Sequence, residues 1–124
     1  MSLKPMSAAR VIMTAEASRR FGLTPRAMRY YEERGLIDVD RDWQNRRCYD
    51  EAAQQRLAWI ATLRSARLPL RDVEDVLLAE VRHGGGAALA DQKLAELSQS
   101  FADLQRSIEV ARANISQTRQ PIAA

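Results

Sequence analysis

The stretch "RAMRYY", residues 26–31, interleaves arginine and tyrosine side chains in a pattern that suits the binding of an anion. Arg26 and Arg29 are three positions apart, so on a helix they lie about one turn apart on the same face. Arginine offers a planar fork of N–H donors that fits phosphate oxygens and the major-groove edge of guanine. Two such side chains on one short helix can reach into a single groove. The open alternative is the solvated face of an ordinary amphipathic helix.

The two tyrosines of this stretch are expected to have different roles. Tyr31 follows Met28 by three residues and Leu23 by eight, which places its ring on the buried stripe of a helix. Its hydroxyl can still reach a phosphate at the edge of that stripe. Tyr30 points elsewhere and is the better candidate for a phosphate contact. The segment therefore combines a core face with an anion-binding face.

Two short helices are expected around a tight turn. Thr14 is the predicted N-cap of the first, after a brief extended lead-in, because a threonine hydroxyl can accept a hydrogen bond from an orphan N–H group. Gly22 suits the left-handed end of that helix, Thr24 followed by Pro25 starts a second one, and Gly35 ends it. The pattern predicts a helix-turn-helix. Both threonines are caps first, and the helix starts they mark can also offer backbone N–H groups to phosphate.

A β-hairpin is expected after the second helix. Residues 36–39 predict a short strand, residues 40–45 a polar turn and residues 46–49 a second strand. Such a hairpin forms a wing beside the helix pair. Three arginines of this wing would flank the second helix and meet an adjacent nucleic-acid backbone: Arg41, Arg46 and Arg47.

Several wing residues leave their roles open. Trp43 at the tip could lie along a sugar-phosphate strand, pack back on the next helix, or meet another protein. Cys48 lies between Arg47 and Tyr49, so strand alternation turns it inward as a structural cysteine. Three acids on one edge would repel DNA, and that edge is expected to face away from it: Asp38, Asp40 and Asp42.

Two more helices complete the predicted domain, which spans residues 11–82. The first covers residues 51–66 and is capped by Asp50, and the second covers residues 70–82. Arg56 on the first of them is a possible phosphate contact, with a solvated face as the alternative. The second has a predicted buried stripe of Leu70, Val73, Val76, Leu77 and Val81.

A glycine linker is expected at residues 83–86, followed by a long helix over residues 87–119. Apolar residues there alternate in steps of three and four, which is a heptad seam. A helix of that length extends about 50 Å at 1.5 Å per residue, too far to be buried against a small domain. The seam therefore needs a partner helix, most simply its own copy. It includes Ala87, Ala90, and the expected dimerisation residues Leu94, Leu97, Phe101, Leu104, Ile108, Ala111 and Ile115.

Charge and composition narrow the function further. The net charge is +3, and the whole excess lies in the first fifty residues, which contain the predicted helix-turn-helix and wing. One cysteine and one histidine, Cys48 and His83, make no metal site on their own. No nucleophile–base pair, carboxylate pair or phosphate loop is visible, so we expect no enzyme, no cofactor and no metal. No apolar run is long enough to cross a membrane, and a cytoplasmic protein is expected.

The stretch "AEASRRFGLTPRAMRYYEERGLI" and the Arg-x-Tyr of "RRCYD" resemble the MerR family of bacterial transcriptional regulators. The resemblance covers residues 12–78, and the family's dimerisation helix fits residues 87–119. It implies a mainly α fold: a winged helix-turn-helix DNA-binding domain with a C-terminal antiparallel coiled-coil helix. Only five residues follow residue 119, so a short member without a C-terminal effector domain is expected. The family's metal and redox sensors use several cysteines, and residues 83–124 contain none.

The resemblance also implies partners and site residues. Regulators of this family bind double-stranded DNA as homodimers on pseudo-palindromic promoter sites, and many distort the duplex to realign the promoter for RNA polymerase. Arg26 and Arg29 match family positions that approach bases and phosphates, and Arg47 and Tyr49 match the Arg-x-Tyr. For Tyr49, packing under the hairpin is the open alternative. Trp43 replaces the small glycine-containing turn that is common in the family.

Two other functions remain open. One is a protein-interaction modulator built on a MerR-like winged helix, although such a module would not need Arg26, Arg29, Tyr30 and Arg47 together on one surface. The other is an anti-regulator whose seam disables a longer relative, and it predicts a weak homodimer.

Overall fold

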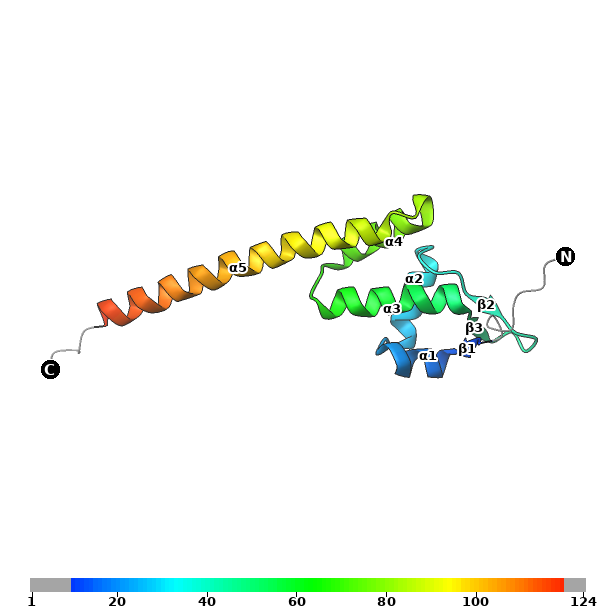
Figure 1. Cartoon of the computed structure of the whole chain (residues 1–124). Coiled ribbons are helices and arrows are strands. Elements are labelled where there is room, and N and C mark those ends of the chain that lie inside the picture. The colour runs from blue at the N-terminus through cyan, green and yellow to red at the C-terminus, as the bar shows by residue number, and fades with distance from the viewer. Residues whose placement is uncertain (1–9, 120–124) are drawn as a thin grey trace.

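The computed structural model describes residues 10–119, which form three short strands and five helices. The strands and the first four helices gather at one end of the molecule, and the last helix projects from them as a long rod (Figure 1). The elements in chain order are β1 (Ile12–Met13), α1 (Thr14–Phe21), α2 (Pro25–Glu33), β2 (Asp40–Arg41), β3 (Arg47–Tyr49), α3 (Glu51–Ser65), α4 (Leu70–His83) and α5 (Gly86–Thr118).

Helices α1 and α2 meet at the predicted glycine turn. Gly22 has a φ of 65°, and its N–H donates to the Ser18 carbonyl at 2.9 Å. Thr24 is the N-cap of α2, since its hydroxyl accepts a hydrogen bond from the N–H of Ala27 at 3.0 Å. The prediction for Thr14 is wrong: Met13 occupies the N-cap of α1 without a side-chain hydrogen bond, and Thr14 is already helical.

The predicted strand over residues 36–39 is also wrong. Gly35 has a φ of 74° and ends the α2 turn, after which Leu36 and Ile37 are both buried. Two consecutive buried side chains do not fit the alternation of an edge strand, and here they fill the core instead. The strand β2 starts only at Asp40.

The three strands form one antiparallel sheet in the order β1-β3-β2. Cys48 on the central strand pairs with Met13 on one side and Asp40 on the other. The extended lead-in is thus the third strand of the wing, which ties the start of α1 to the hairpin. Cys48 is buried as expected, and burial raises the pKa of its thiol.

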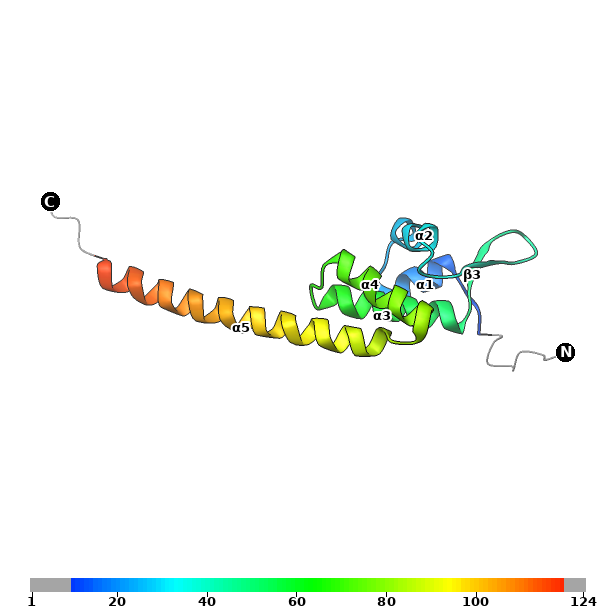
Figure 2. The same ribbon diagram turned by 90° about the horizontal axis from the view of Figure 1, so that it is seen from above.

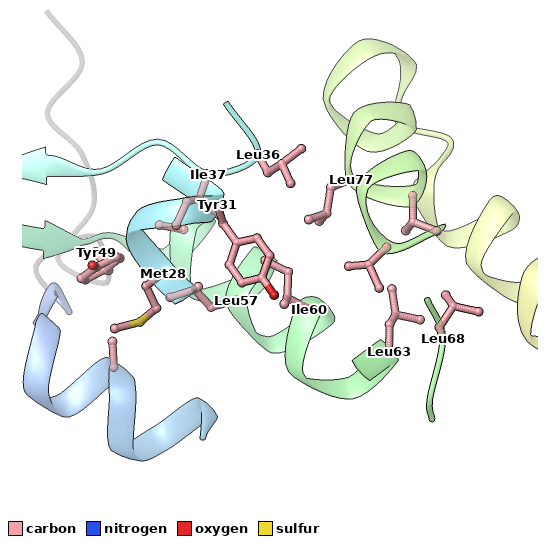
Figure 3. Packing of buried hydrophobic residues seen from close by; sticks show 14 of the residues in the cluster. Met28, Tyr31, Leu36, Ile37, Tyr49, Leu57, Ile60, Leu63, Leu68 and Leu77 are labelled. Carbon is pink, nitrogen blue, oxygen red and sulfur yellow. The ribbon is translucent and has the colours of Figure 1, made fainter. Parts of the chain in front are cut away.

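The core lies between α2, α3, α4 and the sheet, and its members point toward one another in Figure 3. Met28 and Tyr31 belong to it, which confirms the predicted core face of α2. Asp50 caps α3 by accepting from the N–H of Ala53 at 2.9 Å, also as predicted. Val81 departs from the expected stripe of α4 because it is 47% exposed.

The glycine segment is a close junction rather than a flexible linker. Gly86 is buried and already belongs to α5, which turns back along α4. Lys93 of α5 pairs with Asp72 of α4 at 2.9 Å. The first apolar residues of α5 are partly buried against the domain of the same chain. The residues that pack against the domain core are Leu89, Ala90, Leu94 and Leu97.

The expectation that the whole seam needs a partner helix is therefore wrong for the first part of α5. There, Leu94 and Leu97 are partly covered by the domain of the same chain. Beyond them the seam is exposed, and it includes Phe101, Leu104, Ile108 and Ile115. Within residues 10–119, no helix has the length and apolar character that crossing a membrane requires.

Candidate nucleic-acid interface

The exposed face of α2 carries two unengaged arginines. Arg26 and Arg29 are both exposed, and neither forms a hydrogen bond or ion pair with another residue in the range 10–119. Helix α2 lies at one edge of the domain and α5 leaves from the opposite edge (Figure 2). The two guanidinium groups are consequently available to an external anion.

A basic hollow of about 350 Å³ lies between the start of α1 and the wing. The first turn of a helix has N–H groups without intrahelical partners, and they attract an anion. Among the residues that the structure describes, no side chain caps this turn of α1, so its N–H groups can serve as donors to an anion. The residues that line the hollow are Met13, Thr14, Ala15, Arg41, Arg46 and Arg47. We call this the basic hollow.

The wing tip is held by a single aspartate. The Asp42 carboxylate accepts hydrogen bonds from the N–H groups of Gln44 at 2.9 Å and Arg46 at 2.8 Å. It also pairs with the Arg46 guanidinium at 2.9 Å. The pKa of Asp42 is lowered, first by the backbone hydrogen bond from Arg46. Asn45 adopts a φ of 61°, the conformation that a glycine often supplies in such turns.

Trp43 projects from this braced turn into solvent. Its side chain is 89% exposed, which rules out the expectation that it packs back on α3. The two other expectations, contact with a sugar-phosphate strand or with a protein, remain.

Arg47 connects the wing to α2. Its Nε donates to the Glu32 carboxylate at 2.8 Å, and this hydrogen bond raises the pKa of Arg47. Arg41 donates from Nη1 to the Asn45 carbonyl at 3.0 Å. The wing arginines are therefore oriented by the protein itself before any ligand arrives.

Tyr49 does not reach the interface. Its side chain is fully buried, and within the described residues its hydroxyl has no hydrogen-bond partner. The expectation of a DNA contact at Tyr49 is wrong because a side chain without exposed surface cannot touch a ligand. The alternative, packing under the hairpin, is what the structure has.

We expect Tyr49→Phe to leave DNA binding unchanged and to keep or raise the free energy of unfolding. A buried hydroxyl without a partner costs about 1–3 kcal/mol of desolvation, and phenylalanine keeps the ring. Urea denaturation and a duplex-binding titration check both parts. Tyr49→Ala serves as the contrast, because it removes the ring and should destabilise the fold by about 3–5 kcal/mol. Weaker DNA binding by a normally stable Tyr49→Phe variant would restore the hydroxyl as a contact.

Tyr30 has a partner that sequence reasoning missed. Its hydroxyl donates to Glu74 Oε1 at 3.0 Å, and Arg34 Nη2 donates to Glu74 Oε2 at the same distance. The Arg34 guanidinium also lies 5.8 Å from the centre of the Tyr30 ring. Glu74 directly follows the buried Val73 of α4, and only the packing of α4 beside α2 reveals the contact. Tyr31, by contrast, is a core residue whose pKa is raised mainly by burial.

Arg56 lies apart from the basic hollow. It is 3.9 Å from the exposed Asp38 carboxylate and lines a different, smaller hollow between α3 and α4. Glu80 and Trp59 are among its neighbours there. The structure does not bring Arg56 together with Arg41, Arg46 and Arg47.

The arrangement is a winged helix-turn-helix with an appended long helix. Residues 12–80 match the family model described as the MerR helix-turn-helix family regulatory protein. This match covers more than half of the chain, and the chain belongs to the MerR family.

A curated relative agrees with that assignment. The chain is similar to the HTH-type transcriptional regulator CueR of Bacillus subtilis, with 38% identity over 63 residues, 51% of this chain and 44% of the relative. The chain thus matches less than half of that relative's length.

Solved structures show the same fold. HiNmlR, described as a MerR family regulator lacking the sensor domain and bound to promoter DNA, matches with a TM-score of 0.61, 20% identity and coverage of 80% of this chain and 79% of its own. A putative MerR family regulator from Listeria monocytogenes matches with a TM-score of 0.64, 23% identity and 87% coverage of both chains. Identities this low establish the fold alone.

Proposed function

We propose that the chain is a sequence-specific DNA-binding transcriptional regulator that acts as a homodimer on a pseudo-palindromic promoter site. The observation that carries the proposal is the basic hollow, which three wing arginines line together with the start of α1. Arg26 and Arg29 project from the neighbouring α2 and have no hydrogen-bond or ion-pair partner within residues 10–119. One duplex strand in the hollow would bring α2 to the adjacent groove. Such a regulator would act in the cytoplasm.

The roles of the side chains follow from their surroundings. Arg26 and Arg29 are free to make contacts with base edges in the major groove, where arginine pairs with guanine. Arg41, Arg46 and Arg47 are already oriented by Asn45, Asp42 and Glu32, which suits contacts to phosphate at fixed positions. Phosphate contacts set the register of the protein on the duplex, and base contacts supply sequence specificity.

The homodimer rests on α5. From Phe101 to Ile115 its heptad seam is exposed along one chain, and a second copy in antiparallel orientation would bury both seams. Two domains held this way present two α2 helices to two half-sites. Distortion of the DNA between the half-sites, of the kind that realigns a promoter for RNA polymerase, costs of order 1–6 kcal/mol.

A salt titration on nonspecific duplex DNA tests the proposal. A dimer that binds phosphates should lose affinity steeply as salt rises, with a slope that grows by about 0.9 per neutralised phosphate. No retention at low salt, or retention that is independent of salt, would favour the protein-interaction modulator. Selection of bound duplexes from a random pool then gives the half-site sequence and spacing.

Two alanine variants separate the base contacts from the phosphate contacts. Arg26→Ala is expected to weaken operator binding more than nonspecific binding, with a loss of about 1–3 kcal/mol on the operator. Arg47→Ala is expected to weaken both equally and to reduce the salt slope by about one. Fluorescence anisotropy on operator and scrambled duplexes measures both. Identical behaviour of the two variants would show that the roles are assigned wrongly.

A further inference from the structure

One face of α2 carries three polar side chains that differ in whether they have a partner within the domain. Arg26, Tyr30 and Arg34 follow one another at intervals of four residues, so they form one stripe along the helix. The first has no partner among the described residues, whereas the other two are both held by Glu74 of α4. We call Tyr30, Arg34 and Glu74 the α2–α4 clasp.

In the clasp, two donors that could bind an external anion already bind the carboxylate of Glu74. One oxygen of Glu74 accepts from a tyrosine hydroxyl and the other from a guanidinium, each at 3.0 Å. A DNA phosphate offers the same pair of acceptor oxygens to the same two donors. The Arg34 side chain is 54% exposed and Tyr30 is 38% exposed, while Glu74 is only 15% exposed. The donors therefore face solvent, and the carboxylate approaches them from the protein side.

We propose that Glu74 is a built-in competitor of DNA: it occupies a phosphate site formed by Tyr30 and Arg34, and the duplex backbone displaces it. The inference rests on the proposed function and adds Arg34 as a DNA-contacting residue and Glu74 as a residue that limits affinity. The Arg34 side of this ion pair is more than half exposed, and ion pairs at the protein surface contribute little to stability, so a phosphate can approach Arg34 from solvent and exchange for the carboxylate. Because Glu74 stays within reach, it also repels the phosphate that replaces it.

The variant that tests this proposal is Glu74→Gln. Glutamine keeps the size and one acceptor oxygen but removes the charge that competes with phosphate. We expect the full-length variant to bind nonspecific duplex about fivefold more tightly than the wild type, the upper end for one surface charge pair. Asp75→Asn is the matched control, because it removes the same charge one position away on a side chain that pairs instead with Lys93.

A second pair of variants localises the effect. In an Arg34→Ala background the phosphate site is already lost, so Glu74→Gln should then add no more affinity than Asp75→Asn does. Circular dichroism and urea denaturation establish that all variants are folded before binding is compared.

The outcomes are distinct. A wild type that fails to bind duplex at low salt overturns the proposed function. A wild type that binds, with Glu74→Gln no tighter than Asp75→Asn, overturns the competitor role alone. If Glu74→Gln instead weakens binding, Glu74 orients Tyr30 and Arg34 rather than competing with the duplex. A gain that persists in the Arg34→Ala background shows that the charge acts at a distance and removes Arg34 as the contact.

Discussion

We expect the Ile108→Asp variant to sediment as a monomer and to lose at least about a hundredfold in operator affinity. Ile108 lies in the exposed part of the α5 seam, where it is 48% exposed in the single chain. Pairing with a second copy would bury it, and each fully buried isoleucine contributes about 1.5–3 kcal/mol. Two charges brought into that seam would oppose association. A monomer then binds one half-site at a time and loses the gain of about 10²–10⁴ that two linked sites supply.

The Ala113→Asp variant is the matched control for this experiment. It introduces the same charge on the same exposed stretch of helix, five residues further along, on the side away from the seam. It should remain dimeric and bind operator normally. Sedimentation velocity and anisotropy titrations measure both properties. An Ile108→Asp variant that stays dimeric would place the interface elsewhere, and one that is monomeric but binds normally would separate dimerisation from DNA binding.

The second large effect is expected at the α4–α5 junction. A methyl group at Gly86 would lie 2.7 Å from Glu80 Cβ, 2.8 Å from the Trp59 ring and 2.8 Å from the Val76 carbonyl oxygen. Two of these neighbours are a buried backbone atom and a bulky ring, which cannot move independently. We therefore expect Gly86→Ala to lower the free energy of unfolding by about 1–3 kcal/mol, as overpacking of a filled interior does. Thermal and urea denaturation of the full chain measure the change.

Gly85→Ala provides the control one position earlier. Its added methyl would meet only the side chain of His83, at 2.5 Å from the ring. That side chain is exposed and can rotate away, so we expect a change in unfolding free energy within about 0.5 kcal/mol. Equal stability of the two variants would show that the start of α5 is not fixed against α3 and α4.

Several helix ends could be predicted from local sequence signals. Thr24 and Pro25 start α2, Gly22 ends α1, and Asp50 caps α3, each through contacts within four residues along the chain. Such signals depend on backbone geometry and nearby hydrogen bonds, so they could be found without knowledge of the packing.

Failures of prediction arose where local pattern and tertiary packing disagree. Leu36 and Ile37 have the composition of a strand, yet the core between α2 and α3 takes both side chains. Thr14 has the chemistry of a cap, but pairing of β1 with β3 brings Met13 to that position instead. Tyr49 matched a family motif, and its burial is decided by the sheet and the helices that cover it.

The sequence by itself determined the helix-turn-helix, the basic wing and the heptad seam, because these depend on spacing along one chain. Only the tertiary structure decided that Tyr30 contacts Glu74, which lies forty-four residues further along the chain. It also decided that α5 packs against the domain at Gly86. The physical reason is the same in both cases. Contacts between distant segments depend on the volume and direction of side chains in three dimensions, and a one-dimensional pattern does not contain that information.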